Sequence, residues 1–349
     1  MMKKRGLRQV KINQPSTAFF ILLFALWAAS PGGAAAFSRA PKSAGGGSTI
    51  PMHITAQSSS VKGAATRVNA VVPRTVRFRE VEGRGLLVKM WINRMGAYTF
   101  AIDTGAGATI LSRRVAADAQ VSVINSETFE IRGLSSADRT VGRKATLREL
   151  AIGDRHNRLT PGGAVIVVDE LPPGIDGVLD PTEAFRPFGY VINISAGVLS
   201  AFDPSRSPLH IDGEAGDGVI VPWLRETRGR RPFVMIEGGR RALLDTGSGL
   251  GLAVSETAAR ALRIAVPVSP DESGRKDDSR DFTGAAVRAR RIRPATVFIG
   301  ALALRHVPTD LLLGVEAETP ILLGRDALRP FQITFDSVNR LIQLKPVSD

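Results

Sequence analysis

After about residue 80 the chain consists mainly of short apolar runs separated by turn-forming residues, a pattern typical of β-strands. Several pairs of runs flank a short polar or glycine-containing turn, which predicts hairpins. These pairs are Gly85–Ile92 with Ala97–Ile102, Pro232–Ile236 with Arg241–Leu244, and Gln332–Phe335 with Arg340–Leu344. Val165–Val168 and Asp310–Leu313 are predicted to be short buried strands.

Helical periodicity is confined to two short segments, Arg113–Gln120 and Glu256–Arg263. Each follows a serine, Ser112 or Ser255, in the position of a helix N-cap. The pattern therefore favours an all-β protein with two short helices.

The strand pattern occurs twice. Phe100–Ser112 contains Asp-Thr-Gly and recurs as Ala242–Ser255, so Asp103 and Asp245 are 142 positions apart. Other segments recur in the same order at nearly the same offset: Ala151–Gly153 as Phe298–Gly300, Val178–Leu179 as Leu322–Leu323, and Phe188–Asn193 as Phe331–Asp336. Matches in a constant order predict a duplicated unit.

The N-terminal residues have the pattern of a secretory signal. A basic stretch ending at Lys11 precedes the apolar run Ala18–Ala29, and Ala34-x-Ala36 provides a cleavage site. The run is too short for a membrane-spanning helix. We expect cleavage after Ala36 and export to the periplasm or the exterior, with an uncleaved membrane anchor as the alternative.

The domain boundaries follow from these patterns. We predict a signal peptide at 1–36, a flexible lead-in at 37–67, an N-terminal lobe at 68–205, a linker at 206–217 and a C-terminal lobe at 218–346. The two lobes are called the first and second copy below.

The amino-acid composition excludes several kinds of functional site. The absence of cysteine excludes disulfides, thiolate metal sites and a cysteine nucleophile. The net charge is +13, and five of the positive charges lie in residues 1–36, which leaves +8. Without a nucleic-acid-binding motif, this charge is interpreted as a solvated basic surface.

The two Asp-Thr-Gly segments, Ile102–Ala106 and Leu244–Ser248, resemble those of pepsin-like and retropepsin-like aspartic proteases. The closing segments Ile321–Leu328 and Ile333–Asn339 are similar to the same family, and the resemblance covers roughly residues 75–346. It implies an all-β bilobal fold, with two pseudo-symmetric β-barrel lobes and a central cleft. One chain carries both motifs, so a monomer is expected to be active.

The resemblance implies that Asp103 and Asp245 are the catalytic pair. Two carboxylates ~3 Å apart repel by about 5 kcal/mol at an effective dielectric of ~20. They therefore share one proton over a wide pH range, which supplies an acid and a base together. The implied reaction is hydrolysis of a polypeptide by a water held between them. Neither role is assigned to one residue.

The neighbouring residues take supporting roles by the same resemblance. Gly105 and Gly247 allow the tight turns. Thr104 and Thr246 are expected to hydrogen-bond across the lobe interface. Ser248 is expected to hydrogen-bond the outer oxygen of Asp245, whereas Ala106 offers no such group to Asp103.

The flap is expected in a hairpin after the first helix, at Phe129–Ser136, with Gly133, Leu134 and Ser135 as its candidate residues. Its equivalent in the second copy is Ser279–Ala286. Neither segment contains tyrosine, so the flap tyrosine of pepsins is missing.

A second departure from the family pattern is Asp180, which stands where the second copy has Gly324. Glycine there would serve a close backbone approach behind the catalytic turn. Asp180 is either harmless or the mark of a first copy that has diverged.

Other chemistries fit less well. Gly247–Gly251 lacks the third glycine of a dinucleotide site, and the four histidines form no metal-ligand motif. Ser248 has no histidine base beside it in sequence. No cofactor, metal or nucleic-acid partner is expected. The alternative function is an inactive, protease-like module that binds peptides in the same cleft.

Overall fold

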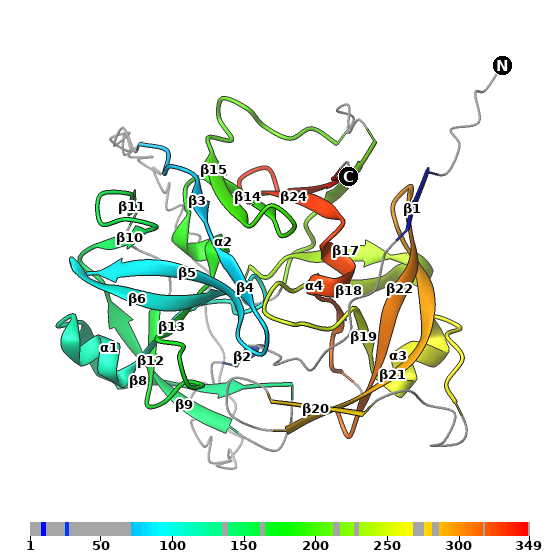
Figure 1. Cartoon of the computed structure of the whole chain (residues 1–349), viewed down its shortest axis with the longest axis horizontal. Helices are drawn as coiled ribbons and strands as arrows, with labels where there is room; N and C mark the ends of the chain where they lie inside the picture. Colours follow the sequence, from blue (N-terminus) through cyan, green and yellow to red (C-terminus); the bar gives the residue numbers. More distant parts are fainter. Residues whose placement is uncertain are drawn as a thin grey trace, which may run out of the picture. The chain divides into compact units, whose positions relative to one another are not determined.

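The computed structural model describes residues 8–11, 25–27, 71–134, 139–160, 165–211, 217–226, 230–267, 276–280, 286–316 and 318–347. Most of these residues lie in three β-sheets, which confirms the β-rich fold class (Figure 1). The lead-in at 37–67 lies outside the described residues. The predicted domain boundaries remain predictions.

The first sheet is built mainly from the first copy. Its order is β11 (Arg158–Leu159), β10 (Leu150–Ile152), β5 (Gly85–Ile92), β6 (Met95–Ile102), β13 (Gly177–Leu179), β7 (Thr109–Ser112), β12 (Val165–Val168), β9 (Arg139–Thr146), β8 (Ser122–Arg132) and β2 (Ala25–Trp27), with β4 (Arg79–Val81) paired to β5. The β5–β6 hairpin feeds directly into the first Asp-Thr-Gly turn.

The second sheet repeats the β5-to-β8 part of this order with seven strands of the second copy. It runs β17 (Phe233–Ile236), β18 (Arg240–Leu244), β23 (Ile321–Leu323), β19 (Leu252–Val254), β22 (Leu302–Leu313), β21 (Ala286–Ile299) and β20 (Lys276–Arg280), with β1 (Arg8–Lys11) paired to β22. The pairing senses also agree. β18 and β23 are parallel as are β6 and β13, and β19 and β22 are parallel as are β7 and β12. The duplication seen in the sequence is thus a duplication of topology.

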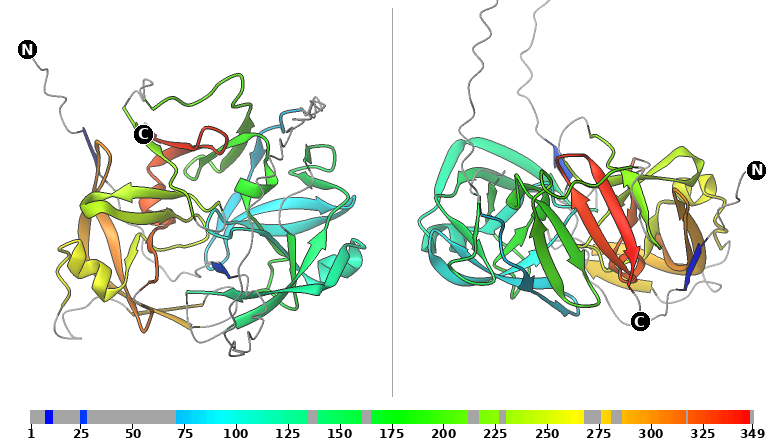
Figure 2. Two further views of the ribbon diagram at one scale, coloured as in Figure 1. Left: turned by 180° about the vertical axis from the view of Figure 1, so that it is seen from behind. Right: turned by 90° about the horizontal axis from the view of Figure 1, so that it is seen from above.

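A third sheet joins the copies. Its order is β16 (Val219–Pro222), β25 (Leu341–Pro346), β24 (Phe331–Asp336), β14 (Gly189–Asn193), β15 (Val198–Phe202) and β3 (Val76–Arg77). At its centre β14 of the first copy and β24 of the second pair antiparallel, with Ile192 opposite Ile333. Figure 2 shows these green and red strands side by side. Equivalent segments of the two repeats therefore meet along one hydrogen-bonded ladder.

Closed barrels are not confirmed. The described strands form sheets whose first and last members are not paired to each other. The sheets formed by the described strands are open, and what the two copies share is the order of seven strands.

The first predicted hairpin is confirmed with a tighter turn. The chain reverses at Asn93 and Arg94, which both have positive φ, 48° and 74°, and β6 begins at Met95. Two positive φ angles in succession match the twist of the flanking strands, so a two-residue turn replaces the predicted four-residue one. In the second copy the turn is a 3-10 helix, η1 (Glu237–Gly239).

Both predicted helices exist and are shorter by two residues at their C-terminal ends. They are α1 (Arg113–Asp118) and α3 (Glu256–Ala261). Ser112 accepts a hydrogen bond from the Val115 N–H and Ser255 from the Ala258 N–H, so both N-caps are confirmed. Two single-turn helices were not predicted, α2 (Pro181–Ala184) and α4 (Arg325–Leu328).

The predicted signal contains two described segments, β1 and β2, which pair with β22 and β8. None of the described helices is long and apolar enough to cross a membrane.

One large apolar cluster extends through both copies and the joining sheet. At its middle the Tyr190 and Phe335 rings stack with centroids 4.6 Å apart, and the Trp223 ring meets Phe335 edge-on at 6.0 Å. Two smaller clusters lie apart from it. One contains Ala101 and Val178 of the first copy, and the other contains Leu243 and Leu322 of the second.

This packing makes Phe335 a test of the joining sheet. Phe335 is fully buried, so Phe335→Ala should lower the free energy of unfolding by about 3–5 kcal/mol. Val338 is 59% exposed, and Val338→Ala should change it by less than ~0.5 kcal/mol. Guanidinium denaturation measures both. Equal losses in the two variants would show that the aromatic stack does not hold the copies together.

Candidate functional site

The two Asp-Thr-Gly turns are anchored in the same way. Each follows the last residue of a strand, β6 or β18. The Asp103 N–H donates to the Leu179 carbonyl at 3.0 Å, and the Asp245 N–H donates to the Leu323 carbonyl at 2.9 Å. The parallel neighbours β13 and β23 therefore fix where each aspartate leaves its sheet.

The two threonines join the turns by reciprocal hydrogen bonds. The Thr104 N–H donates to Thr246 Oγ1 at 3.1 Å, and the Thr246 N–H donates to Thr104 Oγ1 at 3.0 Å. The Thr104 hydroxyl also donates to the Leu244 carbonyl, and the Thr246 hydroxyl to the Ile102 carbonyl. Both side chains are fully buried. The bonds expected between the copies are present, and they tie each turn to the residue before the other aspartate.

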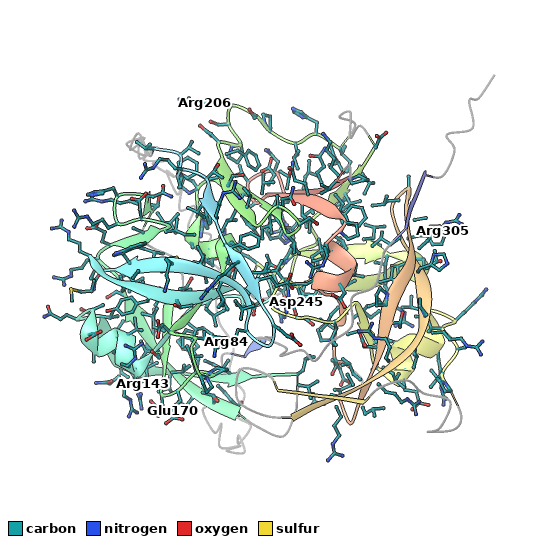
Figure 3. All side chains as sticks on the ribbon, viewed as in Figure 1. Arg84, Arg143, Glu170, Arg206, Asp245 and Arg305 are labelled. Atoms are coloured by element: carbon teal, nitrogen blue, oxygen red, sulfur yellow. The ribbon has the colours of Figure 1, made fainter. Side chains whose placement is uncertain are left out.

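The carboxyl groups of Asp103 and Asp245 are brought together beside Gly105. A Cβ on Gly105 would lie 3.0 Å from Asp245 Oδ1 and 3.2 Å from Asp103 Oδ1. Any side chain there would press against both carboxyls, so this position requires glycine. Both aspartates are fully buried, and Asp245 is labelled in Figure 3, near the short helix α4.

Backbone donors bind the inner oxygen of each carboxyl. Gly105 N–H donates to Asp103 Oδ1 at 2.7 Å. Asp245 Oδ1 accepts two bonds, from Gly247 N–H at 2.8 Å and from Ser248 N–H at 3.2 Å. The Oδ2 atoms of both are buried and receive no hydrogen bond from the residues that the structure describes.

The prediction for the Ser248 hydroxyl is wrong. Its Oγ accepts a hydrogen bond from the Leu250 N–H at 3.2 Å, and only the backbone N–H of Ser248 reaches Asp245. Serine hydroxyls commonly bond the backbone two residues ahead, and this local turn takes the hydroxyl away from the carboxyl.

Burial raises the pKa of both carboxyls, and the two sites differ. The pKa of Asp103 is well above its usual value because of burial and the charge of Asp245. Burial raises the pKa of Asp245 to about 6, and the adjacent carboxyl of Asp103, the Gly247 and Ser248 N–H groups and the cation of Arg325 hold it down. Adjacent groups whose pKa values are both shifted, by different amounts, are typical of acid–base sites.

The close backbone approach predicted for Gly324 is confirmed. A Cβ there would lie 2.3 Å from the Leu250 carbonyl oxygen. Its counterpart Asp180 has an ordinary φ of −84° and caps α2, accepting a hydrogen bond from the Thr182 N–H at 2.8 Å. Any residue adopts this backbone angle, so the position in the first copy does not require glycine. Burial raises its pKa to about 8, so it is mainly protonated at pH 7.

The hairpin expected to hold the flap exists as β8 and β9, between α1 and β10. Leu134, beyond the end of β8, is buried in the apolar cluster of the second copy with Phe233 and Leu250. Gly133 is half-buried beside it. Ser135 lies outside the described residues. The second hairpin is β20–β21, and residues 281–285 of its predicted flap lie outside the described part.

One residue of the site was missed at the sequence level. Arg325 has a side chain only 2% exposed, and its Nη1 donates to the carbonyls of Thr246 and Gly247. The available signal was a single arginine inside the apolar segment Ile321–Leu328, since a buried arginine requires polar partners.

Comparison with known proteins agrees with part of this picture. Residues 88–179 match a family model described as an aspartyl protease. The match contains Asp103 and supports an aspartic protease family and protease activity in general. No curated protein matches the chain.

The hydrogen bonds of Thr104 can be tested by an isosteric change. Thr104→Val removes the acceptor of the Thr246 N–H and the donor to the Leu244 carbonyl. Each buried group left unpaired should cost about 1–3 kcal/mol of unfolding free energy. Thr104→Ser keeps the hydroxyl and should lose less. If denaturation shows that Thr104→Val is as stable as Thr104→Ser, the hydrogen bonds between the copies contribute nothing to the unfolding free energy.

Asp180 generates a pH-dependent prediction. Its pKa in the folded chain, about 8, lies above the ordinary value of 3.8, so its contribution to stability is present below pH 4 and lost as the pH rises to 8. Asn stays neutral and can keep the bond to Thr182. The unfolding free energy of Asp180→Asn minus that of the wild type should therefore increase as the pH rises from 4 to 8, by on the order of a few kcal/mol.

The exposed Glu170 provides the control, because Glu170→Gln should show no such trend in denaturation series at the same pH values. A difference between Asp180→Asn and wild type that stays constant with pH would mean that Asp180 is ionised in the folded chain.

Proposed function

We propose that the protein is an aspartic endopeptidase in which Asp103 and Asp245 activate a water against a peptide bond. The observation that carries the proposal is the approach of both carboxyls to Gly105, in turns locked by the Thr104 and Thr246 hydrogen bonds. A reaction of this type needs one base and one acid on the same water and carbonyl. Two adjacent buried carboxyls sharing a proton provide both.

The chemical steps follow from that arrangement. The ionised carboxylate takes a proton from water as the water oxygen attacks the carbonyl carbon. The protonated carboxyl hydrogen-bonds the carbonyl oxygen, where negative charge develops. As the C–N bond breaks, one of the two carboxyls, both now protonated, gives its proton to the leaving amine, and the pair returns to its singly protonated state.

The proposed architecture is bilobal and pseudo-symmetric, with each copy contributing one aspartate. Its support is the order of seven strands that the two large sheets share and the antiparallel pairing of β14 with β24. Because one chain supplies both turns, the active form is a monomer.

The proposed substrate is an extended polypeptide, held under the β8–β9 hairpin with its backbone hydrogen-bonded in strand fashion. Leu134 supports this, because it carries the end of the hairpin into the second copy. The signal-like N-terminus supports export, so the substrates would be proteins of the cell envelope or exterior.

An inactive peptide-binding module is the second candidate. It is favoured by the positions of the only two tyrosines. Tyr98 donates to Asp118, and Tyr190 lies in the joining sheet against Phe335, so neither serves the flap. Cleavage separates the two candidates.

Replacing either aspartate by asparagine should lower kcat by at least 10²–10⁴-fold, because the water loses its base or the carbonyl its acid. The double variant Asp103→Asn/Asp245→Asn should be little worse than either single one, since the pair acts as a unit. Wild-type activity should fall as the pH drops through about 6, where Asp245 becomes protonated and no base remains.

The assay uses purified chain and an unstructured protein substrate over pH 3 to 8. Asp169→Asn, at an exposed aspartate, is the matched control and should keep full activity. Cleavage by Asp245→Asn at the wild-type rate would place the chemistry elsewhere. A wild type that binds extended peptides and never cleaves them would favour the binding module.

A further inference from the structure

Arg325 and Asp245 lie on opposite sides of the same two peptide units. In the first unit the Thr246 carbonyl accepts from Arg325 at 2.9 Å, and the Gly247 N–H donates to Asp245 Oδ1 at 2.8 Å. In the second the Gly247 carbonyl accepts from Arg325 at 2.8 Å, and the Ser248 N–H donates to Asp245 Oδ1 at 3.2 Å. Since C=O and N–H of a trans peptide point in opposite directions, a cation on the carbonyl side aims both N–H groups at the carboxylate.

Glu80 holds this arginine from the first copy. Its carboxylate, on β4, accepts from Arg325 Nε at 3.2 Å and from both terminal nitrogens of Arg329 at 2.8 and 2.9 Å. These contacts keep the pKa of Glu80 below its usual value despite the opposing effect of burial. The start of β5 also lies against the guanidinium, because a Cβ on Gly85 would be 3.4 Å from Arg325 Nη1.

Among the residues that the structure describes, none gives the first turn an equivalent support. Pro181 stands where the second copy has Arg325, so no guanidinium lies behind Thr104 and Gly105 at that position. Asp103 Oδ1 accepts one backbone bond within its turn, and the nearby Asp180 adds a carboxyl rather than a cation. The two copies therefore differ at the position that places a charge behind the turn.

We infer that Arg325, held in place by Glu80, is a positioning residue that makes Asp245 the ionised base of the pair and leaves the shared proton on Asp103. This inference rests on the proposed function and deepens it, since it assigns the two roles. Both residues lie outside the segment that matches the protease family model. Neither touches the reacting atoms, and both act through the turn that holds Asp245.

Several charged groups surround this arrangement and enter its pH dependence. Those facing Asp245 or Arg325 are Asp103, Glu80 and Asp326. Asp180 acts on Asp103, Arg329 acts on Glu80 and Asp326, and Arg291 and Asp310 act on Asp326. The test must therefore follow the carboxyl of Asp245 itself.

The experiment is a ¹³C NMR titration of carboxyl-labelled aspartates in the full chain, with the Asp245 signal assigned by its loss in Asp245→Asn. Arg325→Gln removes the cation, so the Asp245 midpoint should rise by about one pH unit or more. Glu80→Gln keeps an acceptor for Arg325 and removes the charge that neutralises it, so the midpoint should fall. Glu82→Gln, two residues away and exposed, should leave it unchanged.

Opposite shifts of the Asp245 midpoint in Arg325→Gln and Glu80→Gln support the inference. A midpoint that moves in neither variant, or that moves as much in Glu82→Gln, overturns it. If Arg325→Gln does not fold, Glu80→Gln against Glu82→Gln decides alone, because the side chain of Glu80 is partly exposed and Gln matches its shape.

Kinetics then separate this inference from the proposed function. In an active enzyme Arg325→Lys should lower kcat more than it raises KM, because a lysine keeps the charge and loses the two-carbonyl contact. A chain that cleaves no peptide but shows the opposite shifts contradicts the protease and supports the charge assignment. A chain that cleaves peptides with an unmoved Asp245 midpoint contradicts the charge assignment alone.

Discussion

The structure depends on keeping two carboxyl groups close together away from water. Carboxylates that are desolvated and adjacent repel strongly, and a chain left to relax would separate them. Here Asp103 and Asp245 leave separate sheets, and the paired threonines hold their turns against each other. Away from the turns, the joining sheet and its aromatic stack hold the two copies together. The remaining electrostatic strain is relieved by a proton, which is also what the proposed reaction uses.

The duplication explains why the frame is symmetric, and the substitutions within it explain why the charge is not. Equivalent strands supply both aspartates, both threonines and both helix caps. The residue pair behind each turn has changed, from Gly324 and Arg325 in the second copy to Asp180 and Pro181 in the first. One turn therefore rests on a buried cation and the other on a helix capped by a buried carboxyl. Such a difference gives two chemically identical side chains different tasks.

Much of this was predictable where the signal is local. The hairpins, Ser112, Ser255 and the Asp-Thr-Gly repeat were identified because turn chemistry, capping and strand patterning act within a few residues. The close approach at Gly324 was inferred by comparing the copies. The single-turn helices α2 and α4 were missed because four residues carry no periodicity. The hydroxyl of Ser248 was misassigned because a local backbone bond competes for it. Glu80 could not be identified from the sequence, because its partner Arg325 lies 245 positions away and no motif links the two residues.

The central claim is that the aspartates act as one unit carrying a single proton. The most direct measurement is a difference potentiometric titration of the wild type against Asp103→Asn/Asp245→Asn, read beside the pH dependence of peptide cleavage. The account predicts a range starting near pH 6 in which the wild type carries one more negative charge than the double variant, and cleavage confined to that range. A difference of two charges from pH 5 upward would show that both carboxyls ionise independently, and would contradict the account.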